Sequence, residues 1–423
     1  MAGIGLLVLV VGGLFIFGGR KTEKVPEVDL VVWGVEDRNA MNNVLGNYMG
    51  ARGNVSVKYQ QMDPATYEDA LLNALAAGRG PDVFAFKNTW LPKHFNKWAP
   101  ASETQFGLAR LRQLFPTVVE QDFAPDGIIF SLPLYIDTLA LYYNQEIFDT
   151  VGIALPPATW TAFQELIPRL RQADTAGNII RAAAALGGSS RSISRAADIL
   201  SLLMLQAGAK MTNQDFTQAT FAGRVGDFVP GLDALDFYTQ FADRQNRFYT
   251  WNDNLGEDLD NFSKGKLAMI VNYGEAQKDL KDLNPFLKYK IAPLLQPTLT
   301  DSAVNYASYW SLAVSNKAEY PDWAWDLIIY LATDELANDS YLRESGRSPA
   351  LRGLIQKHIA DPEVGVFAKQ ALSARAWPLI DERQVANIFS QMIQSVVSGQ
   401  LDSKTALFQA EQSVTDLISA VRD

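Results

Sequence analysis

Polar and aromatic side chains follow two expected strands, at the ends where a ligand could reach them. Val28–Trp33 is a nearly continuous apolar run followed by Glu36, and Val83–Phe86 is a second such run followed by Asn88 and Trp90. In open α/β lobes, ligands lie at the strand ends that face a cleft. A carboxylate, an amide and a flat indole in such places favour binding of a small molecule with polar and apolar surfaces. The alternative is a solvated glutamate and a half-buried groove tryptophan.

The rare residue types exclude several chemistries. The chain has no Cys, which removes disulfides, thiolate metal sites, cysteine nucleophiles and the lipid-carrying Cys of bacterial lipoproteins. Its two His, His94 and His358, stand outside any metal-binding motif and are expected to be ordinary surface or groove residues. Lys and Arg number 37 against 47 Asp and Glu, a net charge of −10 without a dense basic run, so we expect no nucleic-acid partner. We also expect no catalytic residue, metal ion or cofactor.

The elements that must position the candidate residues alternate between strand and helix. A length of 423 residues exceeds one ordinary core and predicts two or three lobes. Apolar strands separated by amphipathic helices are typical of a doubly wound α/β lobe. In chain order, the pattern predicts strand, helix, strand, helix and strand over Val28–Trp33, Asn39–Met49, Val55–Gln60, Tyr67–Ala77 and Val83–Phe86. Later helical and strand-like runs predict a second lobe, notably Thr138–Tyr143, Trp160–Ala173, Ile193–Gln206, Leu267–Asn272 and Trp310–Ser315.

The N-terminal segment Ala2–Gly19 is uncharged and strongly apolar. Its length is at the short end of the ~17–25 residues that a spanning helix needs, and it also suits a secretory signal. Because it lacks a basic start and a good cleavage site, we expect Ile4–Phe17 to remain as a membrane anchor, with a cleaved signal and a secreted protein as the alternative. Arg20, Lys21 and Lys24 on the exported side oppose this expectation, because positive residues favour the cytoplasmic side.

Several motifs occur in an order that is known from one protein family. The sequence resembles the extracellular solute-binding proteins of bacterial ABC importers, and the sugar-binding, maltose-binding-protein-like branch is closest. The matching stretches cover nearly everything after residue 28. They are Ala76–Val83, Asp126–Tyr135, Leu141–Phe148, Pro156–Trp160, Phe262–Met269, Tyr289–Leu294 and Ala324–Leu331. The missing lipid-carrying Cys departs from the family pattern and leaves the mode of anchoring in doubt.

The resemblance implies an α/β protein with the two-lobed, periplasmic-binding-protein-like fold of type II. The chain would cross between the lobes about three times, near Tyr135–Thr138, Ile291–Leu295 and Leu331–Leu336, and a ligand in the cleft would close them. The expected division is an anchor or signal at 1–19, a linker at 20–28, a first lobe from 29–134 and 295–334, and a second lobe from 138–291 and 338–423.

The resemblance also implies ligand contacts near the crossings. Tyr135 and Asp137 fall at the first crossing, and Asp137 matches an acidic ligand contact of the family by its position after Leu132-Pro133. Its alternative role is to cap a turn. Tyr273 and Glu275 follow a strand where the family places a ligand-facing loop.

The remaining candidates lie in loops and at the second crossing. Trp310, at the start of a strand, is the expected stacking surface for a sugar ring. Ser189 lies in a Gly-Gly-Ser-Ser loop and Trp251 in a polar, aromatic loop, where either could instead be structural. Arg347 follows Ser-Gly in a family loop that faces the cleft, and a surface arginine is the alternative.

Three functions remain open. The leading one is a receptor, expected to be a monomer on the outer face of the cytoplasmic membrane, that binds a mono- or oligosaccharide and delivers it to an ABC permease. No GxxxxGK[ST] nucleotide loop occurs, as expected of a receptor whose energy is supplied elsewhere. The second is a surface-anchored binding or sensing module without a permease. The third is a glycoside hydrolase, in which Glu36 and Asp137 would act as acid and base at ~5–10 Å separation.

Overall fold

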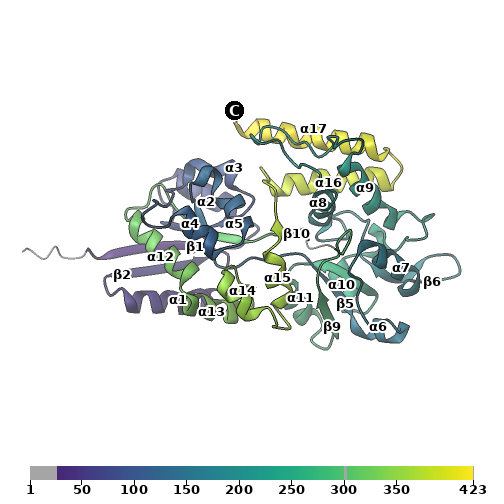
Figure 1. Ribbon diagram of the computed structural model, residues 1–423, viewed down its shortest axis with the longest axis horizontal. Coiled ribbons are helices and arrows are strands. Elements are labelled where there is room, and N and C mark those ends of the chain that lie inside the picture. The colour runs from purple at the N-terminus through teal and green to yellow at the C-terminus, as the bar shows by residue number, and fades with distance from the viewer. Residues whose placement is uncertain (1–25, 300–302, 423) are drawn as a thin grey trace, which may run out of the picture.

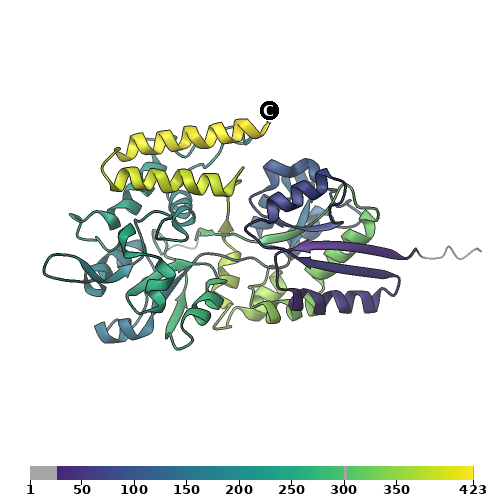
Figure 2. The ribbon, with the colours of Figure 1, turned by 180° about the vertical axis from the view of Figure 1, so that it is seen from behind.

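The computed structural model describes residues 26–299 and 303–422, which form two α/β lobes side by side (Figure 1). The opposite view shows the same two bodies joined by a narrow middle (Figure 2). This architecture confirms the predicted two-lobed fold. The expected anchor at 1–19 lies outside the described residues. Among the residues that are described, no helix has both the length and the apolar character that a membrane span requires.

The first lobe is built on a five-stranded mixed sheet of order β2-β1-β3-β11-β4. Strand β1 pairs in parallel with β2 and β3, whereas β11 runs antiparallel to β3 and β4. Its strands are β1 (Val28–Gly34), β2 (Val55–Gln61), β3 (Val83–Lys87), β4 (Ser131–Pro133) and β11 (Trp310–Val314). The parallel strands end at one edge, which brings Glu36 and Lys87 to the side that faces the second lobe.

Helices cover both faces of this sheet. Helix α1 begins after Asp37, whose carboxylate accepts hydrogen bonds from the backbone N–H groups of Asn39 and Ala40, and it buries Met41 and Tyr48. The other helices of the lobe surround the same core. The helices are α1 (Arg38–Ala51), α2 (Tyr67–Ala76), α3 (Leu91–His94), α4 (Leu108–Leu114), α5 (Thr117–Phe123), α12 (Pro321–Thr333), α13 (Glu335–Ser345) and α14 (Arg352–His358).

The second lobe has its own five-stranded sheet of order β6-β7-β8-β5-β9. Every residue of β8 is buried, as expected of a central strand with a continuous apolar sequence. The strands are β5 (Ala140–Asn144), β6 (Gln172–Ala173), β7 (Ile179–Ala184), β8 (Leu267–Asn272) and β9 (Tyr289–Ala292). Because β8 ends at Asn272, the loop that carries Tyr273 and Glu275 leaves the sheet at the edge between the lobes.

The helices of the second lobe enclose a separate apolar core. Helix α7 begins where the hydroxyl of Thr159 accepts a hydrogen bond from the N–H of Ala162, and Trp160 is buried next to it. The two C-terminal helices lie over the top of this lobe in Figure 1. The helices are α6 (Gln145–Val151), α7 (Trp160–Leu170), α8 (Ala196–Gln206), α9 (Pro230–Thr239), α10 (Asp258–Ser263), α11 (Ala276–Leu283), α16 (Glu382–Val397) and α17 (Ser403–Arg422).

The chain crosses between the lobes in three places. The first joins β4 to β5, and the second runs from β9 to β11 through the short strand β10 (Asn305–Tyr306), as predicted. The third passes through α15 (Gly365–Ala371) and β12 (Ala374–Arg375), which pairs with β10.

The third crossing differs from the predicted one. Leu331–Leu336 joins α12 to α13, and both helices pack within the first lobe. Asn338 fixes this arrangement, because its carboxamide donates hydrogen bonds to the carbonyls of Leu134 and Leu331. Helix α13 packs on α1 and α14 on α4, so the part of 338–423 that includes α13 and α14 lies with the first sheet.

Candidate functional site

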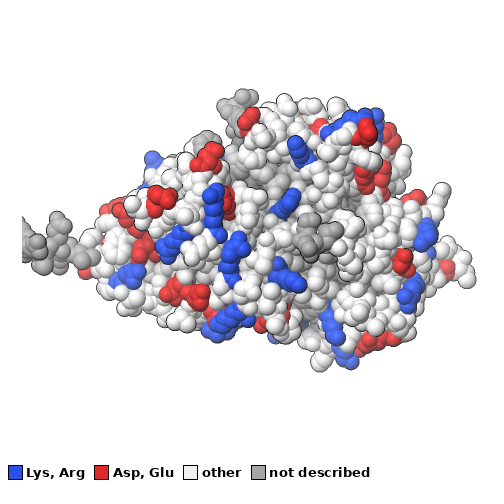
Figure 3. Space-filling model, viewed as in Figure 1, with Lys and Arg blue, Asp and Glu red and all other residues white. Residues whose placement is uncertain are grey.

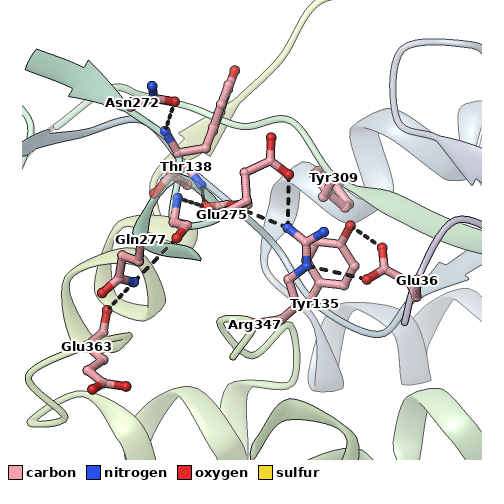
Figure 4. Close-up of polar contacts among 12 residues, drawn as sticks. Glu36, Tyr135, Thr138, Asn272, Glu275, Gln277, Tyr309, Arg347 and Glu363 are labelled. Atoms are coloured by element: carbon pink, nitrogen blue, oxygen red, sulfur yellow. Dashed lines mark hydrogen bonds and ion pairs between the residues drawn. The ribbon is translucent and has the colours of Figure 1, made fainter. Parts of the chain in front are cut away.

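Arg347 lies between the lobes and contacts carboxylates from both of them (Figure 4). Helix α13 ends at Gly346, whose φ of 67° lets the chain turn so that Arg347 points inward. Its Nε is 3.4 Å from Oε2 of Glu36, and its Nη1 is 3.2 Å from Oε2 of Glu275 and 3.7 Å from Oδ2 of Asp137. The guanidinium also lies over the ring of Tyr135, 4.6 Å from its centroid.

Glu36 is fixed by hydroxyl groups as well as by Arg347. The hydroxyl of Tyr135 donates to Oε1 at 2.8 Å, and that of Tyr341 donates to Oε2 at 3.0 Å. The Glu36 side chain is 11% exposed. A carboxylate with this many donors is held in one orientation.

Asp137 is buried at the first crossing and is held by backbone N–H groups. Thr138 and Gly274 donate to its Oδ1 at 2.9 and 2.8 Å, and Glu275 donates to Oδ2 at 3.2 Å. A Cβ on Gly274 would lie 3.0 Å from Oδ1, so any larger residue there would require the carboxylate to shift by a few tenths of an ångström. Burial raises the pKa of Asp137 to about 6, against the opposing influence of Arg347.

The loop after β8 supplies a second charged group. Arg195 Nη2 donates to Oε1 of Glu275 at 2.7 Å, and its Nε donates to Oδ1 of Asn272 at 3.2 Å. The guanidinium of Arg195 lies 4.9 Å from the ring centroid of Tyr273, whose hydroxyl donates to Asp198. Burial opposes ionisation of Glu275, but the two arginines outweigh it and lower its pKa.

Aromatic rings of the first lobe form a wall beside these charges. Trp310 is half-buried at the start of β11. Behind it, Trp90 lies edge-on at 5.1 Å between ring centroids, and Tyr67 lies edge-on at 5.6 Å. The ammonium of Lys87 is 5.7 Å from the Trp310 ring centroid. Trp90 is only 7% exposed, so Trp310 is the ring whose surface remains available.

The lobes also meet at the N-terminus of α16. Lys87 Nζ lies 2.9 Å from Oε1 of Glu382, and the backbone N–H of Leu379 donates to the carbonyl of Thr89 at 3.1 Å. These bonds and the Arg347 contacts hold the lobes together. The aromatic wall of the first lobe therefore faces the charged wall of the second lobe, which consists of Arg195, Asp198 and Glu275.

Two open pockets flank this region. One of about 680 Å³ is lined by Glu36, Glu275, Lys278 and Arg347 among others. Another of about 1120 Å³ is lined from the first lobe by Asn88 and Asp122 and from the second by Met211. On the outer face drawn in Figure 3, acidic and basic side chains are interspersed.

Three of the predicted residues belong neither to the charged groups around Arg347 and Glu275 nor to the aromatic wall. Ser189 Oγ donates to Asp253 at 2.6 Å, and Trp251, 1% exposed, lies in the core of the second lobe. Asn88 donates to Asp122 at 3.0 Å. The polar groups of these side chains are hydrogen-bonded within one lobe. Polar loop residues often stabilise their own loop in this way instead of binding a ligand.

The two histidines are paired with acids. His94 Nε2 is 2.9 Å from Glu68, and His358 Nε2 is 2.6 Å from Asp339. His94 is buried, so the expectation of an ordinary surface or groove residue is corrected for it. Within 26–299 and 303–422, no group of three His, Cys, Asp or Glu side chains could hold a metal ion.

Four charged residues of the interlobe region escaped the sequence-based prediction. Lys87 ends β3 next to the predicted Asn88, and a stricter use of the strand-end argument would have included it. Arg195 and Asp198 lie at the start of α8 and contact the loop after β8 within the second lobe, whereas Glu382 at the start of α16 meets the end of β3 only where the lobes meet. No local pattern marks them.

Known proteins resemble the chain in sequence and in fold. A family model for the bacterial extracellular solute-binding protein matches residues 35–338. A binding protein from Brucella abortus is 23% identical over 304 residues, 67% of each chain. The solved structure of the sugar-binding protein MalE from Xanthomonas citri has a TM-score of 0.76 and 19% identity, covering 93% of this chain and 98% of that one. A solute-binding protein from Thermotoga lettingae, bound with alpha-D-tagatose, has a TM-score of 0.70 and 22% identity, covering 92% and 99%.

Proposed function

Because the chain belongs to the bacterial extracellular solute-binding protein family, we propose that it is a receptor that binds a carbohydrate between its lobes and delivers it to an ABC transporter permease. One observation carries this proposal. Trp310 offers a half-buried indole at the end of the first sheet that faces the second lobe, and the ammonium of Lys87 beside it could bind a hydroxyl. A sugar needs both, since its ring face is apolar and its rim carries donors and acceptors.

In this proposal the ligand contacts come from both walls. Trp310 stacks on the sugar ring, with Trp90 supporting it from behind. Glu36, Asp137, Glu275 and Arg347 bind hydroxyls or hold the groups that do, and Tyr135 and Tyr273 orient them. Asn88, Ser189 and Trp251 support the surrounding loops. The relatives with solved structures that are named as bound with tagatose and maltotetraose support a carbohydrate as the solute class.

The cellular setting follows from the family. An extracellular solute-binding protein works on the outer side of the cytoplasmic membrane, so we place the lobes there, as a monomer that meets the permease subunits. The apolar segment 1–19 would retain the protein at the membrane. A sensing module that lacks a permease would use the same cleft, and only the partner would differ.

The contacts of the two carboxylates disfavour a glycoside hydrolase. Glu36 accepts hydrogen bonds from two tyrosines and pairs with Arg347, while Asp137 accepts three backbone N–H groups. A general acid must carry a proton that it can give to the leaving oxygen. Hydrogen bonds and Arg347 already occupy the oxygens of both carboxylates, so neither presents a free oxygen to a leaving group.

Calorimetric titration with a sugar panel tests the proposal. The panel contains tagatose, mannitol, maltose, maltotetraose and mannobiose, and chromatography of each mixture reports any hydrolysis. We expect saturable binding of at least one sugar, which is recovered intact. Absence of binding by every sugar, or conversion to products, would overturn the proposal.

A matched pair of variants locates the site. Trp310→Ala should weaken binding by ~1–3 kcal/mol through lost apolar contact. Trp323→Ala is the control, because Trp323 is also half-buried in the first lobe but lies on α12, away from the second lobe. Equal affinities for the two variants would move the sugar away from Trp310.

A further inference from the structure

Asp198 is an enclosed carboxylate whose charge is not directly paired. It lies in the first turn of α8, and among the described residues its carboxylate accepts one hydrogen bond, from the hydroxyl of Tyr273 at 3.0 Å. Within that part of the chain, no Lys or Arg nitrogen lies within 4.0 Å of it. Arg195 is near enough to act on it electrostatically but is bonded to Glu275 and Asn272. Burial raises the pKa of Asp198, although Arg195 and Lys87 act in the opposite direction.

The surrounding charges do not compensate for it. Among the described residues, the carboxylates that face one another between the lobes are Glu36, Asp137, Asp198, Glu275 and Glu382. The cations that contact these carboxylates include Lys87, Arg195 and Arg347. Arg347 contacts Glu36, Asp137 and Glu275, and Lys87 pairs with Glu382, so Asp198 is the one carboxylate of this set without a cation from the described residues within 4.0 Å. In a space with low dielectric, an unpaired carboxylate favours a ligand of opposite charge.

The protein already places an ammonium group in this setting. Lys87 Nζ lies over the ring of Trp310 and pairs with Glu382, so the indole wall accommodates a cation beside a carboxylate. Asn272 adds a different requirement, since its Nδ2 is buried and has no hydrogen-bond partner among the described residues. A donor of this kind needs an acceptor oxygen, which a hydroxylated ligand supplies and a simple amine does not.

We propose that the ligand is an amino sugar, whose ammonium group is bound by Asp198 while its ring lies on Trp310. This inference rests on the proposed function and narrows its substrate class. The ammonium satisfies the unpaired carboxylate, and hydroxyl oxygens satisfy donors such as Asn272. Asp198 then determines specificity, because a neutral sugar leaves its charge uncompensated.

A titration of matched ligands tests the inference. The probes are a glucosamine dimer, its N-acetylated form, cellobiose as the neutral form, and putrescine as an amine without a sugar ring. On the full chain, we expect the glucosamine dimer to bind at least about tenfold more tightly than the other three, and higher salt to reduce this preference. Equal or tighter binding of the neutral sugars would overturn the amino-sugar inference but leave the proposed function standing. Binding of putrescine alone, or of no probe and no sugar of the wider panel, would overturn both.

Variants assign the preference to Asp198. Asp198→Asn removes the charge with little change in shape, and it should reduce the preference for the glucosamine dimer to less than about threefold. Asp198→Glu keeps the charge and should keep the preference. Asp227→Asn is the control, because it removes one negative charge from an exposed loop of the same lobe. A preference that survives in Asp198→Asn would overturn the role of Asp198, and the wild-type comparison remains decisive if that variant does not fold.

Discussion

The two edges at which the lobes meet differ in how their charges are supported. At the Arg347 edge, one guanidinium serves Glu36, Asp137 and Glu275, and its side chain is 19% exposed. At the α16 edge, no single one of the described residues joins all the ion pairs, and their exposure ranges from the half-buried Lys87–Glu382 to Arg383–Asp69, whose side chains are 65% and 67% exposed. Ion pairs of similar length therefore differ greatly in what their loss would cost.

The difference shows that partners and burial, and not charge alone, determine the strength of an interlobe contact. Removing one member of a buried network leaves other charges without compensation. Removing one member of an exposed pair exposes the other to water, which solvates it. We therefore expect substitutions at the two edges to differ by several kcal/mol in the free energy of unfolding that they cost.

Arg347→Ala should have the largest effect. It leaves Glu36 and Asp137 enclosed without their cation, so the free energy of unfolding should fall by ~3–5 kcal/mol in denaturant titration. Arg347→Lys keeps the charge but loses the planar fork, and we expect a smaller loss. A loss below about 1 kcal/mol for the alanine variant would remove the distinction between the edges.

The pH dependence of stability should sharpen the contrast. The folded pKa of Asp137, about 6, exceeds its ordinary value, so the folded state binds more protons between about pH 4 and pH 6. The contribution of Asp137 therefore makes the protein less stable as pH rises through this window, by roughly 2–3 kcal/mol in total. In Asp137→Asn, the decrease in unfolding free energy that Asp137 causes between about pH 4 and pH 6 should vanish. Unchanged slopes in the two proteins would contradict the raised pKa.

Lys87→Ala should have an intermediate effect. The pair with Glu382 is half-buried, with side chains 17% and 31% exposed, and the ammonium also contacts the Trp310 ring. We expect a loss of about 1 kcal/mol in unfolding free energy. A double-mutant cycle with Glu382→Gln should recover most of it as coupling. Full additivity of the two substitutions would show that the pair is not coupled.

Arg383→Ala should have the smallest effect. Its 3.6 Å contact with Asp69 is exposed on both sides, so unfolding free energy should change by no more than about 0.5 kcal/mol. Thermal or denaturant unfolding beside Arg347→Ala gives the direct comparison. A loss above about 2 kcal/mol would mean that the α16 edge is supported by contacts other than ion pairs.

The sequence predicted the strands of this molecule better than the meeting of its lobes. The apolar run Val28–Trp33 became β1 (Val28–Gly34), and Trp310–Ser315 became β11 (Trp310–Val314), because continuous burial leaves a local signal. The third crossing left none. Whether α13 stays with the first lobe or begins the second depends on packing and on contacts such as that of Asn338 with the carbonyl of Leu134, which is distant in the chain.

The site, like the fold, was predicted in part. Glu36, Asp137, Glu275 and Arg347 were all named from strand ends and family motifs, and the fold brings them together. Trp251 was named because it lies in a polar loop, but its indole N–H donates to Ser192 within the second lobe. Whether an indole points into a cleft or a core depends on packing that flanking residues do not reveal.

A crystal structure of the protein with the sugar that it binds most tightly tests the central claim most directly. We expect the sugar between the two lobes, with one ring face on Trp310 and its polar groups within hydrogen-bond distance of the charged wall that contains Asp198 and Glu275. A sugar bound elsewhere, such as in the pocket of about 1120 Å³ beside Asp122 or on the outer surface of one lobe, would contradict it.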